Sequence, residues 1–236
     1  MRVAALGIPC PDPGTTWRTL LDLPPVDLLV LPELCFMPWL CAQPTVDADA
    51  WADAVAEQDL GRLPDLRADL VVGTMATDRH NVAFAYSGGT LQAVHRKTFL
   101  PDEPGFWEAS WYQRGPVGFQ PVETPGGRLG ISICTEMWFT QHTYPDVDVV
   151  VVPRATPAET SAKWLAGGAV MAVCAGAFCI SSNRAENYMG GTGWVIDPDG
   201  TPLAVTTDEQ PVAIVDIDLA QARAAKRTYP RYVVTD

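Results

Sequence analysis

The chain contains short, almost wholly apolar runs, each ended by a proline, a glycine or a polar residue. Three of them lie at 27–31 (DLLVL), 70–74 (LVVGT) and 147–152 (VDVVVV). Runs of this length, rich in Val and Leu, are typical of β-strands that are covered on both faces. Strands of that kind occur mainly in sheets flanked by helices, so these runs restrict the chain to the α/β class more strongly than any other feature.

Segments with helical periodicity and further strands fill the chain between these runs. Helices are predicted from Thr15 or Thr16 to Leu23, over 47–58, over 161–177 and from Asp218 onward. Other strands are predicted at 3–8, 81–86, 90–95, 118–124, 127–133, 177–181, 193–196 and 212–217. Because we find no linker, repeat or low-complexity segment, residues 1–236 are expected to form a single α/β domain. Hairpin signals among the βαβ units predict a mixed sheet.

Composition narrows the possible partners and the compartment. A formal net charge of −12 argues against a nucleic-acid partner and against an anionic membrane surface. The N-terminal MRVAALGIPC is too short for a signal peptide, and no apolar run reaches transmembrane length, so we expect a cytoplasmic protein with reduced cysteines. Six cysteines without a CxxC pair, and only three histidines, show no zinc pattern, so no metal is expected.

Three chemically capable side chains stand at the ends of apolar runs. Glu33 follows DLLVLP, Lys97 follows LQAVHR, and Cys134 follows GRLGISI. Each has an ordinary alternative: a loop cap for Glu33, a solvated surface lysine for Lys97, and a small core residue for Cys134. Because strand ends in α/β sheets converge on one crevice, the three together indicate a thiol with a base and a cation for its oxyanion.

Other catalytic patterns are missing. The sequence has no GxSxG elbow, no phosphate-binding P-loop and no HExxH helix. The glycines at 190–193 lack the spacing of a dinucleotide-binding loop and are interpreted as a tight turn into a strand. Gly167 and Gly168, inside a predicted helix, weaken that helix unless close packing requires them.

Three blocks of sequence together resemble a known family. LVLPEL around Glu33, HRKTFLPDEPGFWE around Lys97 and GISICTEMWF around Cys134 resemble the catalytic blocks of the nitrilase (carbon–nitrogen hydrolase) superfamily, in the same order. Cys134 follows Lys97 by 37 positions (134 − 97), and Glu108 lies where many members carry an auxiliary glutamate. Residues 181–200 resemble the later blocks, so the resemblance covers nearly the whole chain.

The resemblance implies a four-layer α-β-β-α sandwich that pairs into homodimers and uses no metal or organic cofactor. It implies that Glu33 takes the proton of Cys134 as the thiol attacks an amide carbon. It implies that Lys97 and the N–H of Thr135 hold the oxyanion, with Glu108 orienting Lys97 or binding substrate. A surface position in the long loop is the alternative for Glu108.

Two departures from the family pattern bear on substrate and assembly. Only TQHTYPD, residues 140–146, separates Phe139 from the strand predicted at Val147, where the family has a fuller helix near its pocket and dimer interface. Thr135 follows the cysteine where many members have an aromatic residue. Trp107, Trp111 and Trp138 are therefore predicted to wall the site.

Arg154 follows a strand end and is a candidate for binding a substrate carboxylate, with an internal salt bridge or a dimer contact as the alternative. The helix over 161–177 carries only one charge, Lys163, and its second face is predicted to meet another copy of the chain.

Taken together, the sequence predicts a thiol amidase that hydrolyses a small non-peptide amide to an acid and ammonia. N-carbamoyl amide hydrolysis and nitrile hydrolysis are the alternatives within the family. An inactive member that serves as a binding subunit is the alternative from another class, although the intact Glu33, Lys97, Cys134 and Glu108 argue against it.

Overall fold

The computed structural model describes residues 1–139 and 146–234 and contains two β-sheets joined through their shared first strand. The first sheet has the order β5 (Thr90–Arg96), β4 (His80–Ser87), β3 (Ala68–Thr77), β2 (Val26–Val30), β1 (Arg2–Ile8) and β12 (Val212–Asp216). The second has the order β6 (Val122–Thr124), β7 (Gly127–Ile131), β8 (Val149–Arg154), β9 (Phe178–Arg184), β10 (Trp194–Ile196) and β11 (Pro202–Val205).

Strand β1 belongs to both sheets because its two halves pair with different neighbours. Val3 and Ala4 pair with β2 in the first sheet, whereas Gly7 and Ile8 pair with β9 in the second. Strands β1, β2 and β3 run parallel, as do β7, β8 and β9, while β3–β4–β5 and β6–β7 are antiparallel hairpins. The predicted mixed arrangement is confirmed.

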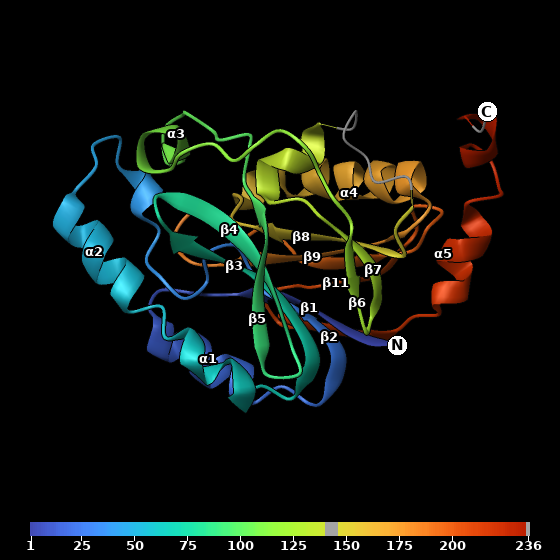
Figure 1. Ribbon diagram of the computed structural model, residues 1–236, viewed down its shortest axis with the longest axis horizontal. Helices are drawn as coiled ribbons and strands as arrows, with labels where there is room; N and C mark the ends of the chain where they lie inside the picture. The colour runs from blue at the N-terminus through green and yellow to red at the C-terminus, as the bar shows by residue number, and fades with distance from the viewer. Residues whose placement is uncertain (140–145, 235–236) are drawn as a thin grey trace.

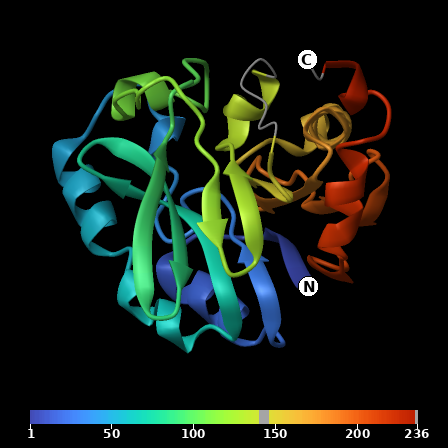
Figure 2. The same ribbon diagram turned by 45° about the vertical axis from the view of Figure 1, so that its right-hand side comes forward.

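Helices cover the outer faces of both sheets, as Figures 1 and 2 show. The α-helices are α1 (Pro13–Leu21), α2 (Ala48–Ala56), α3 (Glu108–Trp111), α4 (Ser161–Ala175) and α5 (Leu219–Ala225). The 3₁₀ turns are η1 (Leu40–Ala42), η2 (Leu60–Asp65), η3 (Cys134–Trp138), η5 (Ala158–Thr160) and η6 (Arg231–Val234). Helix α1 begins earlier than predicted, because the carboxylate of Asp12 caps its first turn and Pro13 fits the first helical position.

Alternate residues of each buried strand point into different layers of the core. Val3, Leu28 and Leu70 from the first sheet share one apolar cluster with Ile131 and Val149 from the second, so this cluster lies between the sheets. Trp17 and Leu20 of α1 share another cluster with Leu29, Leu31 and Val71, on the outer face of the first sheet. With α4 against β8, β9 and β10, the predicted four-layer α-β-β-α sandwich is confirmed.

The sequence prediction also differs from the structure elsewhere. The long segment between Thr98 and Pro116 contains the short helix α3, which was not predicted because the segment has no apolar periodicity. Strand β7 ends at Ile131 rather than at residue 133, and β11 was not predicted. The shortened stretch before β8 falls largely on 140–145, outside the described residues. Over the part of the chain that is described, no helix combines the length and the apolar character needed to cross a bilayer.

Candidate active site

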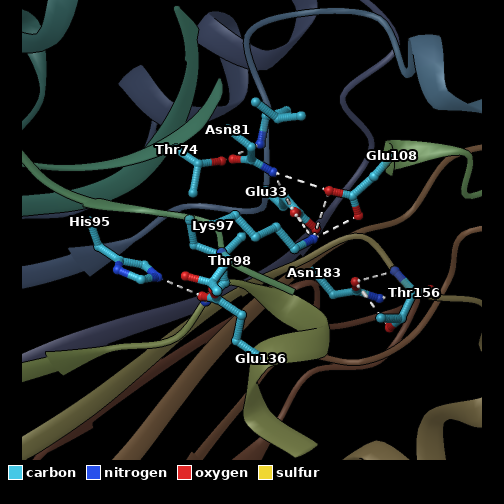
Figure 3. Close-up of polar contacts among 12 residues, drawn as sticks. Glu33, Thr74, Asn81, His95, Lys97, Thr98, Glu108, Glu136, Thr156 and Asn183 are labelled. Carbon is cyan, nitrogen blue, oxygen red and sulfur yellow. Dashed lines mark hydrogen bonds and ion pairs between the residues drawn. The ribbon is translucent and has the colours of Figure 1, made fainter. Parts of the chain in front are cut away.

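The predicted catalytic side chains meet at one end of the sheets, as Figure 3 shows for three of them. Glu33 follows β2, Lys97 follows β5, Glu108 begins α3 and Cys134 begins η3. The Lys97 ammonium donates to Glu33 Oε1 over 2.8 Å and to Glu108 Oε1 and Oε2 over 2.6 and 2.8 Å. All four residues are buried. Residues from four separate segments thus form one compact charged site, and Glu108 contacts Lys97 instead of lying on the surface.

Lys97 is held as an ammonium ion inside the protein. Burial by itself lowers the pKa of a lysine, because the neutral amine loses less hydration than the cation. The carboxylates of Glu108 and Glu33 outweigh that effect and raise the pKa of Lys97 well above its ordinary value. A fixed positive charge in a buried site is well suited to stabilise a developing oxyanion.

Glu108 titrates near neutral pH. Burial raises the pKa of Glu108 to about 7, and the charge of Glu33 adds to this rise, whereas Lys97 and the Asn81 amide oppose it.

Glu33 differs from Glu108 in its hydrogen bonds. Oε1 of Glu33 accepts from Lys97, but its buried Oε2 has no hydrogen-bond partner among the described residues. That oxygen is therefore available to take a proton.

Cys134 lies on a sharp turn where β7 gives way to η3. Its backbone has φ +49°, a left-handed conformation that residues other than glycine rarely adopt. Burial and the nearby Glu33 carboxylate raise the pKa of the Cys134 thiol far above its ordinary value, although Lys97 and the N–H of Ala155 oppose the rise. The thiol is consequently protonated in the free protein and needs a base when it attacks.

A second buried carboxylate ties the Lys97 and Cys134 segments together. Glu136 accepts from the N–H of Ile133 over 2.8 Å and from the N–H of Thr98 over 2.6 Å, and its other contact is His95 Nε2 at 2.8 Å. Ile133 precedes Cys134 and Thr98 follows Lys97 in the sequence, and Figure 3 shows Glu136 between His95 and Thr98. The sequence analysis did not predict this role of Glu136. Its only signal in the sequence is that Glu136 lies two residues after the cysteine.

An open cavity of about 390 Å³ leads to Cys134. Cys134, Thr135 and Glu108 reach it from the catalytic side. The other lining residues are Pro101, Asp102, Glu103, Phe106, Trp138, Ala155, Thr156, Pro157, Thr160, Lys163 and Trp164. The lining thus combines three large aromatic rings with one lysine and two exposed carboxylates, and Trp138 lies where a wall of the site was predicted.

Close packing against α4 holds Trp138 in this wall. A Cβ atom on Gly167 would lie 2.6 Å from the Trp138 ring, and one on Gly168 would lie 2.9 Å from the Trp194 ring. The ring of Trp138 also lies 4.9 Å from that of Trp164, centroid to centroid. Gly167 and Gly168 are therefore explained by close packing, because the indoles of Trp138 and Trp194 leave no room for a side chain at these two positions.

The other two predicted wall residues, Trp107 and Trp111, lie outside the described lining of this cavity. Trp111 is buried and donates its indole N–H to the carbonyl of Gln43 over 2.7 Å. Trp107 packs with the apolar cluster around Met37 and Cys41. The prediction that these two rings wall the site is corrected, because helix α3 turns them toward η1.

Arg154 is also placed differently from the prediction. Its guanidinium is fully buried and donates to Ser181 Oγ over 2.7 Å, to Thr156 Oγ1 over 2.8 Å and to the carbonyl of Thr192. It lies 3.9 Å from the ring centroid of Trp194. With its donors bound internally, Arg154 is not exposed to the cavity for a substrate carboxylate. Its role here is to hold Thr156, which lines the cavity.

Groups of three or more residues able to hold a metal ion are absent from the described part of the chain. The carboxylates near Cys134 are instead occupied by an ammonium group and amide donors.

An α-β-β-α sandwich with a thiol beside a buried lysine and two glutamates is the arrangement that the sequence resemblance implied. The chain belongs to the carbon–nitrogen hydrolase family, whose model matches residues 18–227. A carbon–nitrogen hydrolase from Helicobacter pylori G27 has the same fold, with a TM-score of 0.83 and 20% identity, over 100% of this chain and 95% of that one.

Among curated relatives, N-carbamoylputrescine amidase of Arabidopsis thaliana is 25% identical over 170 residues, 61% of this chain and 57% of that protein. Human deaminated glutathione amidase is 28% identical over 160 residues, 61% of this chain and 49% of that protein. The matches thus span about half the length of these relatives.

Proposed function

We propose that the protein hydrolyses a small non-peptide amide through a thioester on Cys134. One observation carries this proposal: a thiol on a strained turn lines an open cavity and adjoins a buried ammonium ion and carboxylates. Such a set supplies a nucleophile, a base and an electrophilic partner, the three parts that acyl transfer requires. The family membership of the chain supports the same reaction class.

The reaction proceeds in two halves. In the first, Glu33 Oε2 takes the Cys134 proton while sulfur bonds to the amide carbon, and the carbonyl oxygen becomes an oxyanion held by Lys97 and the Thr135 N–H. The oxyanion then re-forms the carbonyl, the carbon–nitrogen bond breaks, and Glu33 gives its proton to the departing ammonia. In the second half, Glu33 takes a proton from water, the hydroxide attacks the thioester, and Cys134 leaves with that proton as the acid forms.

The cavity favours a short, largely apolar acyl group. Trp138, Trp164 and Phe106 offer ring faces and edges for such a group, whereas Arg154 is engaged inside the protein. Polar groups buried without partners are costly, so a densely charged acyl group is disfavoured. Hydrolysis of an N-carbamoyl compound is the second candidate, because several relatives are named N-carbamoylputrescine amidase.

Release of ammonia from a mixed panel of amides, N-carbamoyl amines and nitriles tests the proposal. The expected result is ammonia from simple aliphatic or aromatic amides with the natural sequence and none above background with Cys134→Ala. Ammonia from N-carbamoyl compounds alone favours the second candidate. A panel without any turnover, although the protein is folded, supports the binding-subunit alternative.

We further propose a homodimer formed through α4, in a reducing, cytoplasmic setting. Residues Ala162, Ala166, Val170 and Cys174 recur every four positions and are exposed along one face of this helix. An apolar helix face of this kind supports the dimer. The six unpaired cysteines support the reducing, cytoplasmic setting. Sedimentation should give a dimer at micromolar concentration that Val170→Glu dissociates. A monomer of the natural sequence contradicts the proposed assembly.

A further inference from the structure

Asn81 is a buried amide that contacts both catalytic carboxylates. It lies on β4, is fully buried, and its Nδ2 is 2.8 Å from Glu33 Oε1 and 3.5 Å from Glu108 Oε2. Its backbone carbonyl accepts the N–H of Lys97 over 2.9 Å. Figure 3 shows the side chain directed from the first sheet toward the space between the two glutamates. One residue thus contacts three members of the catalytic set.

The neighbouring carboxylates fix which way this amide points. An amide group has two donor hydrogens on nitrogen and only acceptor capacity on oxygen. Rotating the group by half a turn would place Oδ1 beside Glu33 and Glu108, where two acceptors repel each other. The observed orientation instead leaves Oδ1 without a hydrogen-bond partner in the described structure. An unpaired buried amide oxygen is costly, so the contacts of the nitrogen must offset that cost.

The two oxygens of Glu33 are made unequal by this arrangement. Oε1 accepts from both Lys97 and Asn81, whereas Oε2 accepts from neither. A carboxylate held by one oxygen in this way cannot rotate without losing both hydrogen bonds. We propose that Asn81 is a positioning residue of the reaction, which holds Glu33 so that Oε2 is presented to the Cys134 thiol as the base. This inference rests on the proposed function of Glu33.

The charges around Asn81 explain why the position suits an amide and not a carboxylate. Among the described residues, Lys97 is the only cation that forms ion pairs with these carboxylates, and it already faces two of them. An aspartate has the same shape as asparagine but brings a third negative charge and no donor. It repels Glu33 and Glu108 and competes for the Lys97 ammonium, so Asn81→Asp is expected to be more harmful than the loss of the donor alone.

The rate at which iodoacetamide alkylates Cys134 tests this role, because it requires no knowledge of the substrate. With the catalytic base misplaced, Asn81→Leu should alkylate about 30- to 100-fold more slowly than the natural sequence, as an ångström of misplacement costs about 100-fold. Asn81→Asp should be slower still. Peptide mass spectrometry at Cys134 follows the reaction, and thermal unfolding confirms that each variant is folded.

A double variant separates positioning from general damage. If Asn81 acts through Glu33, adding Asn81→Leu to Glu33→Gln should slow alkylation no more than about threefold beyond Glu33→Gln alone. Effects that multiply in the double variant overturn the proposal, as does a natural rate in folded Asn81→Leu or Asn81→Asp. For any amide that the protein hydrolyses, Asn81→Leu should lower kcat while KM stays within about threefold.

Gln58 offers a matched control. It is another buried side-chain amide, and it hydrogen-bonds the backbone of Ala76 over 2.8 and 2.9 Å, within the cluster beside α2. Gln58→Leu should lower the melting temperature yet alkylate Cys134 at the natural rate. If Gln58→Leu slows alkylation as much as Asn81→Leu does, the positioning role is refuted. Failure of the amidase proposal appears separately, as a lack of ammonia release with normal alkylation behaviour.

Discussion

Replacing Gly167 by alanine tests whether α4 sets the aromatic wall of the cavity. An added Cβ would lie 2.6 Å from Trp138 Cζ3, 2.7 Å from Trp138 Cη2 and 2.8 Å from Met137 Cε. Carbon atoms pack at about 3.5 to 4.0 Å, so the ring must retreat by about 1 Å. Because Trp138 lines the cavity, this retreat changes the shape of the site while leaving Cys134 in place.

The size of the effect follows from two opposing contributions. Overpacking of this kind costs about 1 to 3 kcal/mol of unfolding free energy, and alanine recovers about 1 kcal/mol over glycine within a helix. We therefore expect Gly167→Ala to be destabilised by about 0 to 2 kcal/mol. For an amide with an aromatic acyl group, KM should rise about tenfold, because such a group loses its ring contact.

Gly168→Ala provides the matched control for this prediction. Its Cβ would lie 2.9 Å from the Trp194 indole, a similar clash one position along the same helix. Trp194 is fully buried, so a comparable loss of stability should leave KM unchanged. Steady-state kinetics and denaturant unfolding of both variants decide the matter. An unchanged KM in Gly167→Ala, or an equal rise in Gly168→Ala, refutes the reasoning.

Three further predictions concern the catalytic set. Cys134→Ala should lose activity by orders of magnitude and still unfold cooperatively, whereas Cys35→Ala should stay active; an active Cys134→Ala enzyme would falsify the mechanism. Exhaustive chelation should leave ammonia release unchanged while iodoacetamide abolishes it, and recovery that depends on added metal means that the reaction class is wrong. Burial raises the pKa of Glu108 from 4.5 to about 7. The contribution of Glu108 to the unfolding free energy is therefore fully present below about pH 4.5 and is lost as the pH rises to about 7. Unfolding free energies measured across that range should therefore fall by about 3 kcal/mol more in the natural sequence than in Glu108→Gln, and parallel profiles contradict this.

That the proposed catalytic residues Glu33, Lys97 and Cys134 lie close together could be predicted because each of them follows a strand that the sequence pattern reveals. Glu33 and Cys134 follow buried strands, Lys97 follows the mostly exposed hairpin strand β5, and strand ends are where side chains converge in such sheets. Strand β11 was missed because PLAV is short and mostly exposed, so it lacks a buried run. The direction of Trp107 and Trp111 depends on the turn at α3, which no periodicity marks.

The supporting residues were beyond sequence reasoning because their contacts are distant along the chain. Asn81 lies 48 positions from Glu33, and Glu136 lies 41 positions from His95. Arg154 follows a strand end, as a ligand-binding residue does, yet its partner Ser181 lies 27 positions further on. Only the packing of the two sheets reveals which of these polar side chains support the site and which face the cavity.

Mass spectrometry of the enzyme quenched during turnover tests the central claim most directly. With a simple aliphatic or aromatic amide as substrate, the peptide that contains Cys134 should gain the mass of the acyl group of that amide. The adduct should be absent from Cys134→Ala, and Glu33→Gln should either fail to acylate or acylate slowly without turning over. An added mass of a carbamoyl group alone, with simple amides inert, contradicts the amidase mechanism and establishes the carbamoyl alternative.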